Sequence, residues 1–424
     1  MTTASARRVP RSAAKAADTR RSSAKPTPES DHSERPPSLD NLTLARKEGW
    51  RAFVEAPRRP PPESLSRTKL QALTAAARSE YDRQRRIWHA NLPTIRTTQF
   101  SEIYETLWDI LDSNMQDGDK AKSAVGIEGP AGIGKSICVQ EFGREFHRRE
   151  IAELGEYTSE GNERWPVCRV GMTGNTGMKE FNRGLLGFYN HAATKRGTAA
   201  QFADRALDCV LSCETRLLIV DDLHFLRQRT TSTEISNQFK YISNEFPLTI
   251  IFVGIGLRAR GLYSDGTTPA DNAAAVRRRR SAHPPTGREE GILGQTGRRT
   301  TALTMREFSI DDDEHRLEWR KLLLSLEKQL VLADKHIGML ADDLSDYLYA
   351  RSSGRIGSLT TLIARGCQRA TRSGHEKLDR ELLDAVPNDA ASEAIRPDLQ
   401  VAFEAHRLVS KPTKNRRPRS AGRS

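Results

Sequence analysis

The chain has 424 residues, of which 37% are hydrophobic, and its formal net charge is +12. This length is enough for one large domain or two ordinary domains, each with a real core. No apolar run approaches the ~20 residues of a membrane-spanning helix, so the composition excludes that class of membrane protein and predicts a soluble one.

The positive charge lies in two tails. Residues 1–25 and residues 411–424 each carry a net charge of +6, which accounts for the whole of the +12. Both tails are rich in Ser, Ala and Pro and lack apolar periodicity, so we expect them to be disordered. Either they bind nucleic-acid phosphates without specificity or they only solubilise the chain, and the sequence leaves both alternatives open.

The region before residue 116 is predicted to be a leader followed by helices. A short helix is expected at residues 42–54, and apolar spacing predicts further helices at residues 64–90 and 100–111. We therefore divide this region into a disordered, basic and Pro-rich leader, residues 1–63, and a helical N-terminal extension, residues 64–115.

A phosphate-binding loop pattern, G-x-x-x-x-G-K-[ST], lies between a predicted strand at residues 124–127 and a predicted helix at residues 137–148. The predicted nucleotide-binding residues are Gly129, Pro130, Ala131, Gly132, Ile133, Gly134, Lys135 and Ser136. Glycines let the backbone wrap around the β-phosphate, with N–H groups and the positive end of the helix facing the anion. Lys135 should reach the β- and γ-phosphates, and Ser136 should bind Mg²⁺.

Two acidic residues follow a predicted buried strand further along the chain. Four consecutive aliphatic residues at 217–220 predict a strand buried on both faces, and Asp221 and Asp222 come at its carboxyl end. Ligands of open α/β sheets bind in the crevice at this end of the strands. We predict that Asp221 holds the Mg²⁺ of the nucleotide and that Asp222 orients the attacking water. The alternative is that the two acids only cap a following helix.

Strands and helices alternate through the middle of the chain. This alternation predicts right-handed crossovers and a doubly wound parallel sheet, the α/β architecture of the P-loop NTPases. The remaining strands are expected at residues 166–172, 248–254 and 301–305, and the remaining helices at 178–189, 199–211 and 233–245. The core would occupy residues 116–308, with a polar insertion at residues 264–300. Four consecutive arginines at 277–280 make that insertion either a nucleic-acid contact or a solvated loop.

The last part of the chain is predicted to be helical. Helices are expected at residues 316–330, 340–349, 357–371 and 379–386. They form a C-terminal lid domain at residues 309–388, and a basic tail is expected at residues 389–424. The sequence Gly354-Arg355-Ile356-Gly357 opens the third of these helices.

In their order along the chain, these motifs resemble those of AAA+ ATPases and, more narrowly, of the TniB family of transposition ATPases, which is related to IstB-type and TnsC-type proteins. The resemblance covers roughly residues 64–385. It rests on the phosphate loop, on residues 220–226, 252–254 and 353–359, and on Gln295-Thr296-Gly297-Arg298-Arg299.

The resemblance implies roles for two arginines. Arg355 matches sensor 2, a lid arginine that contacts the γ-phosphate. Arg299, with Arg298 as second choice, falls where such ATPases carry an arginine finger that enters the site of a neighbouring subunit, which makes a homo-oligomer the active unit. The alternative for each arginine is a surface or lid salt bridge.

The sequence departs from the family pattern in two places. Asp222 stands where AAA+ proteins usually have Glu, and its shorter side chain leads us to expect slow hydrolysis. Residues 253–256 offer no polar residue in the place of sensor 1.

The function implied by the resemblance is that of a bacterial, cytoplasmic ATP hydrolase that uses ATP and Mg²⁺. It would assemble as a homo-oligomeric ring or filament on duplex DNA and recruit or activate a transposase there. Two other functions stay open: an AAA+ loader of a helicase or other replication factor, and a nucleotide-switched signalling or scaffold ATPase that does not bind DNA.

Overall fold

The computed structural model describes residues 41–117, 119–172, 177–223, 242, 246–258 and 299–412. The chain divides into two units, Met1–Ser38 and Leu39–Ser424, and all described residues belong to the second. Several predicted features lie outside the described residues: residues 1–40 and 413–424 with most of the basic residues of the two tails, the helix at 233–245 except residue 242, the four arginines at 277–280, and Arg298.

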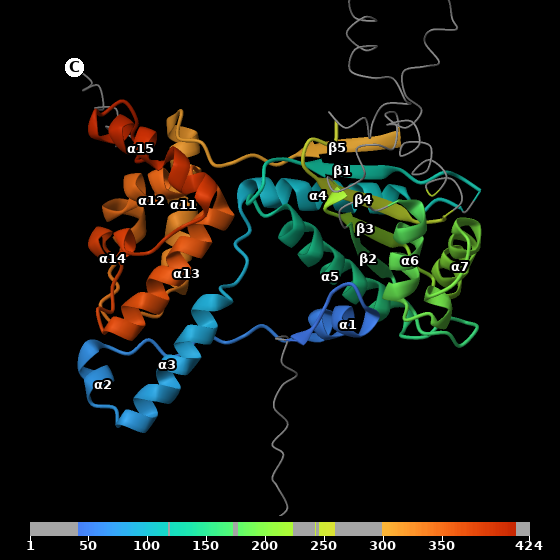
Figure 1. The fold of residues 1–424 in the computed structure, drawn as a ribbon, viewed down its shortest axis with the longest axis horizontal. Helices are drawn as coiled ribbons and strands as arrows, with labels where there is room; N and C mark the ends of the chain where they lie inside the picture. Colours follow the sequence, from blue (N-terminus) through green and yellow to red (C-terminus); the bar gives the residue numbers. More distant parts are fainter. Residues whose placement is uncertain are drawn as a thin grey trace, which may run out of the picture. The chain divides into compact units, whose positions relative to one another are not determined.

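The described secondary structure follows the predicted alternation (Figure 1). In chain order the elements are α1 (Lys47–Glu55), α2 (Arg67–Gln71), α3 (Ala75–Ala90), α4 (Thr98–Ser113), β1 (Ala124–Glu128), α5 (Lys135–Leu154), β2 (Val167–Gly171), α6 (Met178–Phe188), η2 (Ala192–Thr194), α7 (Ala199–Ser212), β3 (Leu217–Asp221), β4 (Thr249–Gly254), β5 (Thr300–Thr304), α11 (Asp313–Gln329), the π-helix η5 (Met339–Asp343), α12 (Ser345–Ser352), α13 (Ile356–Ser373), α14 (Arg380–Asp384) and α15 (Ala390–Glu404).

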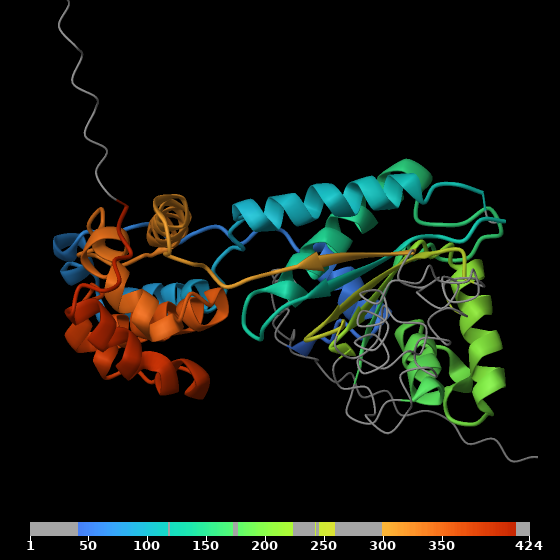
Figure 2. The same ribbon diagram turned by 90° about the horizontal axis from the view of Figure 1, so that it is seen from above.

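The described strands form one parallel sheet with the order β2-β3-β4-β1-β5. Every residue of β3 and of β4 is buried, as expected of strands covered on both faces. Helices α4 and α5 lie on one side of the sheet, and α6 and α7 lie on the other (Figure 2). The predicted doubly wound α/β core is therefore confirmed.

Helix α4 belongs to the core because its apolar face packs on α5. Its buried residues recur at helical spacing, and Tyr104 and Trp108 both contact the ring of Phe142, with centroids 5.4 and 4.8 Å apart. Helix α1 also joins this core, since Trp50 is fully buried and donates to Nδ1 of His147 on α5 at 3.2 Å. This confirms the short helix expected at residues 42–54, inside the leader that was otherwise predicted to be disordered.

The C-terminal helices have their own apolar core, which confirms the predicted helical domain. It includes Trp319 and Leu323 of α11, Leu348 of α12, and Leu362 and Ile363 of α13, all almost completely buried. The domain extends beyond the predicted boundary at residue 388, because α15 packs against α12. The buried guanidinium of Arg351 on α12 bonds Glu393 of α15 at 2.7 Å and fixes this contact.

The predicted helix at residues 64–90 is two helices, α2 and α3. The chain breaks between them because the side chain of Thr74 accepts the N–H of Ala77 and starts a new helix. Helix α3 packs on α13 of the helical domain, whereas α4 packs on the core. The predicted N-terminal extension is therefore shared between the two.

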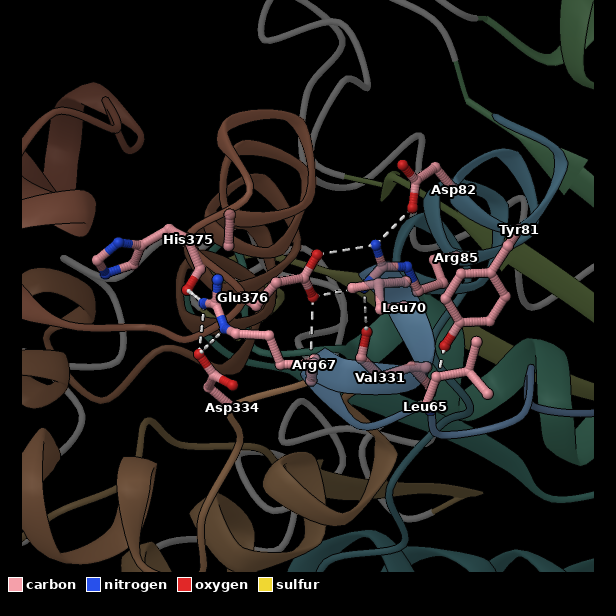
Figure 3. Close-up of polar contacts among 12 residues, drawn as sticks. Leu65, Arg67, Leu70, Tyr81, Asp82, Arg85, Val331, Asp334, His375 and Glu376 are labelled. Carbon is pink, nitrogen blue, oxygen red and sulfur yellow. Dashed lines mark hydrogen bonds and ion pairs between the residues drawn. The ribbon is translucent and has the colours of Figure 1, made fainter. Parts of the chain in front are cut away.

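Buried ion pairs hold α3 against the helical domain (Figure 3). The guanidinium of Arg85 forms two bonds to the Glu376 carboxylate, at 2.6 and 3.0 Å, and both side chains are 1% exposed. Arg78 of α3 adds a 3.1 Å bond to Glu376. Arg67 of α2 pairs with Asp334 (Figure 3). None of the helices in the described residues is long and apolar enough to cross a membrane.

Candidate functional site

A cavity of about 830 Å³ opens at the carboxyl ends of β1, β3 and β4. One wall is the phosphate loop, residues 131–136, with Asp222 and residues 253–255 beside it. The opposite wall comes from the helical domain, through Gly354, Ile356 and Gly357. This volume lies in the range of small-ligand sites, and the carboxyl edge of the sheet is the expected place.

The phosphate loop has the backbone that its glycines permit. Gly129 and Gly134 have φ values of +156° and +88°. A Cβ on Gly129 would lie 2.2 Å from the carbonyl oxygen of Met305, so no side chain fits there. Helix α5 begins at Lys135, directly after Gly134, and its free N–H groups face the loop. The loop therefore forms a cradle that suits a phosphate.

Lys135 is folded into this cradle. Its Nζ donates to the carbonyl oxygens of Gly129 at 2.8 Å and Pro130 at 2.5 Å, and the residue is 8% exposed. Burial lowers the pKa of Lys135, and the attraction of Asp221 and Asp222 opposes that shift. The ammonium group is thus positioned beside the place where phosphate oxygens would lie.

Ser136 and Asp221 converge as a metal site requires. The Oγ of Ser136 donates to Oδ1 of Asp221 at 2.9 Å, and Asp221 is 2% exposed. A hydroxyl and a carboxylate are the hard oxygen donors that Mg²⁺ prefers, and this ion usually takes its other ligands from phosphates and water. The described residues contain no cluster of three or more metal-ligating side chains. The pair therefore fits a metal ion that arrives with a nucleotide.

Asp222 lies beside Asp221 at the cavity, and its role of orienting water stays a prediction. It is exposed, lines the cavity and has a φ of +60°, and its N–H donates to Oδ1 of Asp221 at 3.0 Å. The residues from 224 to 241 lie outside the described chain, so the alternative of helix capping is not tested.

Arg355 stands just before α13 but is not among the residues that line the cavity. Its neighbours Gly354, Ile356 and Gly357 line it instead. The Nε of Arg355 is buried and has no hydrogen-bond partner among the described residues. The sensor 2 role stays a prediction.

Arg299 is exposed and directly precedes β5. Thr300 pairs with Ala124, the first residue of β1, whereas the phosphate loop follows the last residue of β1. Arg299 is therefore at the amino edge of the sheet, opposite the cavity of its own chain. Any contact with a nucleotide would have to be made in another copy, and the finger role stays a prediction.

The cavity is also lined by residues that no sequence motif indicated. The connection between α3 and α4 lines the cavity through Asn91, Leu92, Pro93 and Ile95. In the sequence this segment signals only the end of a helix. From β4, Val253 and Gly254 line the cavity together with the following Ile255.

The solved structures that resemble this chain include several remote likenesses. ORC2 of Aeropyrum pernix, in ADPNP–ADP complexes, is 13% identical with a TM-score of 0.45, over 70% of this chain and 69% of that chain. ORC1 of Aeropyrum pernix in complex with DNA is 14% identical with a TM-score of 0.45, over 77% and 73%. Domain III of the Thermotoga maritima replication initiation protein DnaA is 14% identical with a TM-score of 0.36, over 70% and 93%. These values are too low for us to infer function from them.

Comparison of sequences is more specific. A search of curated proteins finds no match. The sequence model of the family described as bacterial TniB protein matches residues 85–267. The matched segment contains the phosphate loop, both acids after β3, and β4. Of these parts, the phosphate loop, Asp222 and the end of β4 line the cavity. Residues 85–267 of this chain are therefore similar to the TniB family, and this segment carries the phosphate loop of a P-loop NTPase.

Proposed function

We propose that this ATPase binds ATP with Mg²⁺ in the cavity, assembles into a homo-oligomer on duplex DNA, and in that form recruits or activates a transposase at target DNA. One observation carries the proposal. The cavity has one wall from the sheet domain and one from the helical domain, and the N–H of Gly357 bonds the carbonyl of Gly132 between them at 2.7 Å. A nucleotide bound there would contact both walls and so set their arrangement.

Different residues of the cavity would bind different parts of the nucleotide. The loop amides and Lys135 would hold the phosphates, and Ser136 with Asp221 would hold Mg²⁺. A bound Mg²⁺ would neutralise charge on the β- and γ-phosphates. Leu92, Pro93 and Ile95 offer an apolar surface in the same cavity for the flat face of a base.

Hydrolysis requires a water molecule held in line with the γ-phosphate. Asp222 is the exposed carboxylate of the cavity and would accept a hydrogen bond from that water. The charge that develops on the transferred phosphoryl group needs a further cation. Arg299 of an adjacent copy would supply it, since Arg299 lies at the edge of the sheet away from its own cavity.

Binding to DNA would be mainly electrostatic. Each basic tail carries a net charge of +6, and contacts to phosphates carry no sequence information. The expected partner is therefore duplex DNA of any sequence, with the transposase implied by the family.

The test is to measure binding of a fluorescent 50-base-pair duplex with ATP, ADP or no nucleotide, and to follow assembly by sedimentation. We expect tight binding and large assemblies only with ATP, and K135A should show neither. A truncated chain of residues 41–412 separates the tails from the rest. Equal DNA binding in all three nucleotide states would refute nucleotide-gated assembly.

The transposase partner needs its own measurement. We expect ATP-bound protein on DNA to retain a transposase encoded beside it and to stimulate strand transfer. Stimulated delivery of a helicase ring in the same assay, with no effect on strand transfer, would favour the loader function instead.

A further inference from the structure

Both oxygens of the Asp221 carboxylate already have partners. Oδ1 accepts the hydroxyl of Ser136 at 2.9 Å and the N–H of Asp222 at 3.0 Å. Oδ2 accepts Nη2 of Arg169 at 2.7 Å. The first two contacts belong to the phosphate-loop site, whereas Arg169 comes from β2 and is part of none of the sequence motifs.

The sheet register explains why Arg169 meets Asp221. Arg169 pairs with Ile219, and Asp221 is two residues further along β3, so the two side chains are diagonal neighbours on one face of the sheet. The side chain of Arg169 is 16% exposed and that of Asp221 is 3% exposed. The ion pair is therefore largely withdrawn from water, where charges interact more strongly.

Arg169 does not satisfy its own hydrogen-bonding groups at this position. Its Nε is buried and has no partner among the described residues. A guanidinium placed only for packing would usually have its donors satisfied. Arg169 thus keeps its hydrogen bond to Asp221 at this position although its Nε donor is left without a partner among the described residues.

The site as a whole is balanced in formal charge. Lys135 and Arg169 are the cations close to Asp221, and Asp222 is the second anion. A buried carboxylate that is already neutralised attracts a bare divalent cation weakly, and Mg²⁺ loses its water reluctantly. The phosphates of a nucleotide would supply the missing negative charge.

We propose that Arg169 neutralises the Asp221 carboxylate through their ion pair, so that Mg²⁺ enters the site only together with a nucleotide. This inference rests on the proposed binding of ATP with Mg²⁺. Arg169 remains a neighbour of the metal site and weakens the affinity for Mg²⁺ through its positive charge. The affinity for the nucleotide itself depends on the phosphate loop.

Three variants separate charge from hydrogen bonding. R169M removes both, R169Q keeps a donor of similar reach without the charge, and R169K keeps the charge. The readout is thermal unfolding, titrated with MgCl₂ alone and then with MgCl₂ in the presence of saturating ADP. For each variant the Mg²⁺ concentration at half-maximal stabilisation is compared with that of the wild type.

We expect the Mg²⁺ midpoint with ADP to fall on the order of tenfold in R169M and R169Q, and to stay near the wild-type value in R169K. Mg²⁺ alone should stabilise R169M and R169Q but not the wild type. If R169M does not fold, R169Q gives the same comparison. Unchanged or higher midpoints in the uncharged variants would overturn the inference. Whether wild-type protein binds ADP at all tests the proposed function separately.

Discussion

The backbone N–H of Gly357, in the first turn of α13, donates a 2.7 Å hydrogen bond to the carbonyl oxygen of Gly132 in the phosphate loop. These residues are far apart in the sequence, and the bond joins the helical domain to the loop that would hold a phosphate. Each of the two domains has its own apolar core. The cavity is lined by residues of both domains, so its shape depends on the contact between them.

The first prediction concerns this contact. In G357A the added Cβ would lie 2.7 Å from the Gly132 carbonyl oxygen, so α13 must move away from the loop. We expect the affinity for ADP to fall about tenfold, which corresponds to one lost backbone bond of about 1 kcal/mol or slightly more. Calorimetric titration with ADP measures it. In the control G187A, a Cβ meets only the end of Arg46, and its ADP affinity should be unchanged. Wild-type affinity in G357A would contradict the role of the contact.

The second prediction concerns Asp222. D222N should lower the rate of phosphate release about a hundredfold or more, because the amide cannot accept a proton from water. Asn tolerates the left-handed φ of +60° at this position, so the backbone should be preserved. ATP affinity should stay close to that of the wild type, and D222E should retain hydrolysis because it keeps the carboxylate. A D222N variant with normal turnover would remove Asp222 from the mechanism.

The third prediction concerns Arg299. R299A should bind ATP but not hydrolyse it, and K135A should bind no ATP although it still carries Arg299. Mixed together, they should hydrolyse ATP, because the arginine of K135A can enter the intact site of R299A. Phosphate release at varied mixing ratios measures this, with exposed Arg372 as the control in R372A. A mixture as inactive as its separate components would argue against an arginine finger at this position.

The fourth prediction concerns the pH dependence of stability. Burial lowers the pKa of His89 and that of His147 from 6.5 to about 4. Nε2 of His89 accepts the N–H of Val331 at 3.0 Å, so this bond needs the neutral ring. Between pH 6.5 and pH 4 the unfolded chain binds protons that the folded chain lacks, so stability is lost as the pH falls through this window.

Each of these histidines should contribute up to about 1.4 kcal/mol per pH unit to the slope. H89Q keeps an acceptor for Val331 without titrating, so its slope should be smaller. H147Q should act likewise, and the two effects should add. Urea unfolding at pH 7, 5.5 and 4.5 provides the slopes. If H89Q has the wild-type slope, His89 does not contribute to the acid sensitivity.

The fifth prediction concerns the ion pair that fastens α3. Breaking one side of the buried Arg85–Glu376 pair, in R85M or E376M, should lower the free energy of unfolding by about 3 kcal/mol, because the remaining buried charge keeps only Arg78 or Asp82 as its partner. The double variant R85M/E376M should recover part of the loss. The exposed pair of Arg83 with Glu80 provides the control R83M, which should change little. A double-mutant cycle in urea gives the coupling, and a negligible coupling would show that packing alone holds α3.

The phosphate loop and the acids after β3 could be predicted from the sequence because their chemistry is local. Fixed spacing between Gly129 and Ser136, with a strand before and a helix after, specifies the cradle by itself. The aliphatic run before Asp221 likewise specifies a buried strand and the edge where its acid emerges.

Other features depended on pairs of residues that the chain brings together only when it folds. Arg169 reaches Asp221 across 52 residues, and Arg85 reaches Glu376 across 291. Local periodicity does not reveal which side chains meet across strands or domains. It also did not reveal that the connection after α3 would line the cavity.

The sequence by itself thus determined the α/β fold class, the order of the described strands and helices, and the place of the phosphate loop and of the acids after β3. Only the tertiary structure decided that α3 belongs to the helical domain, that α15 belongs to it as well, and that Asp221 is paired with an arginine. The reason is that backbone geometry and the burial pattern of an element depend on residues close together in the sequence. Ion pairs and domain contacts depend on strand register and packing between residues far apart in the sequence.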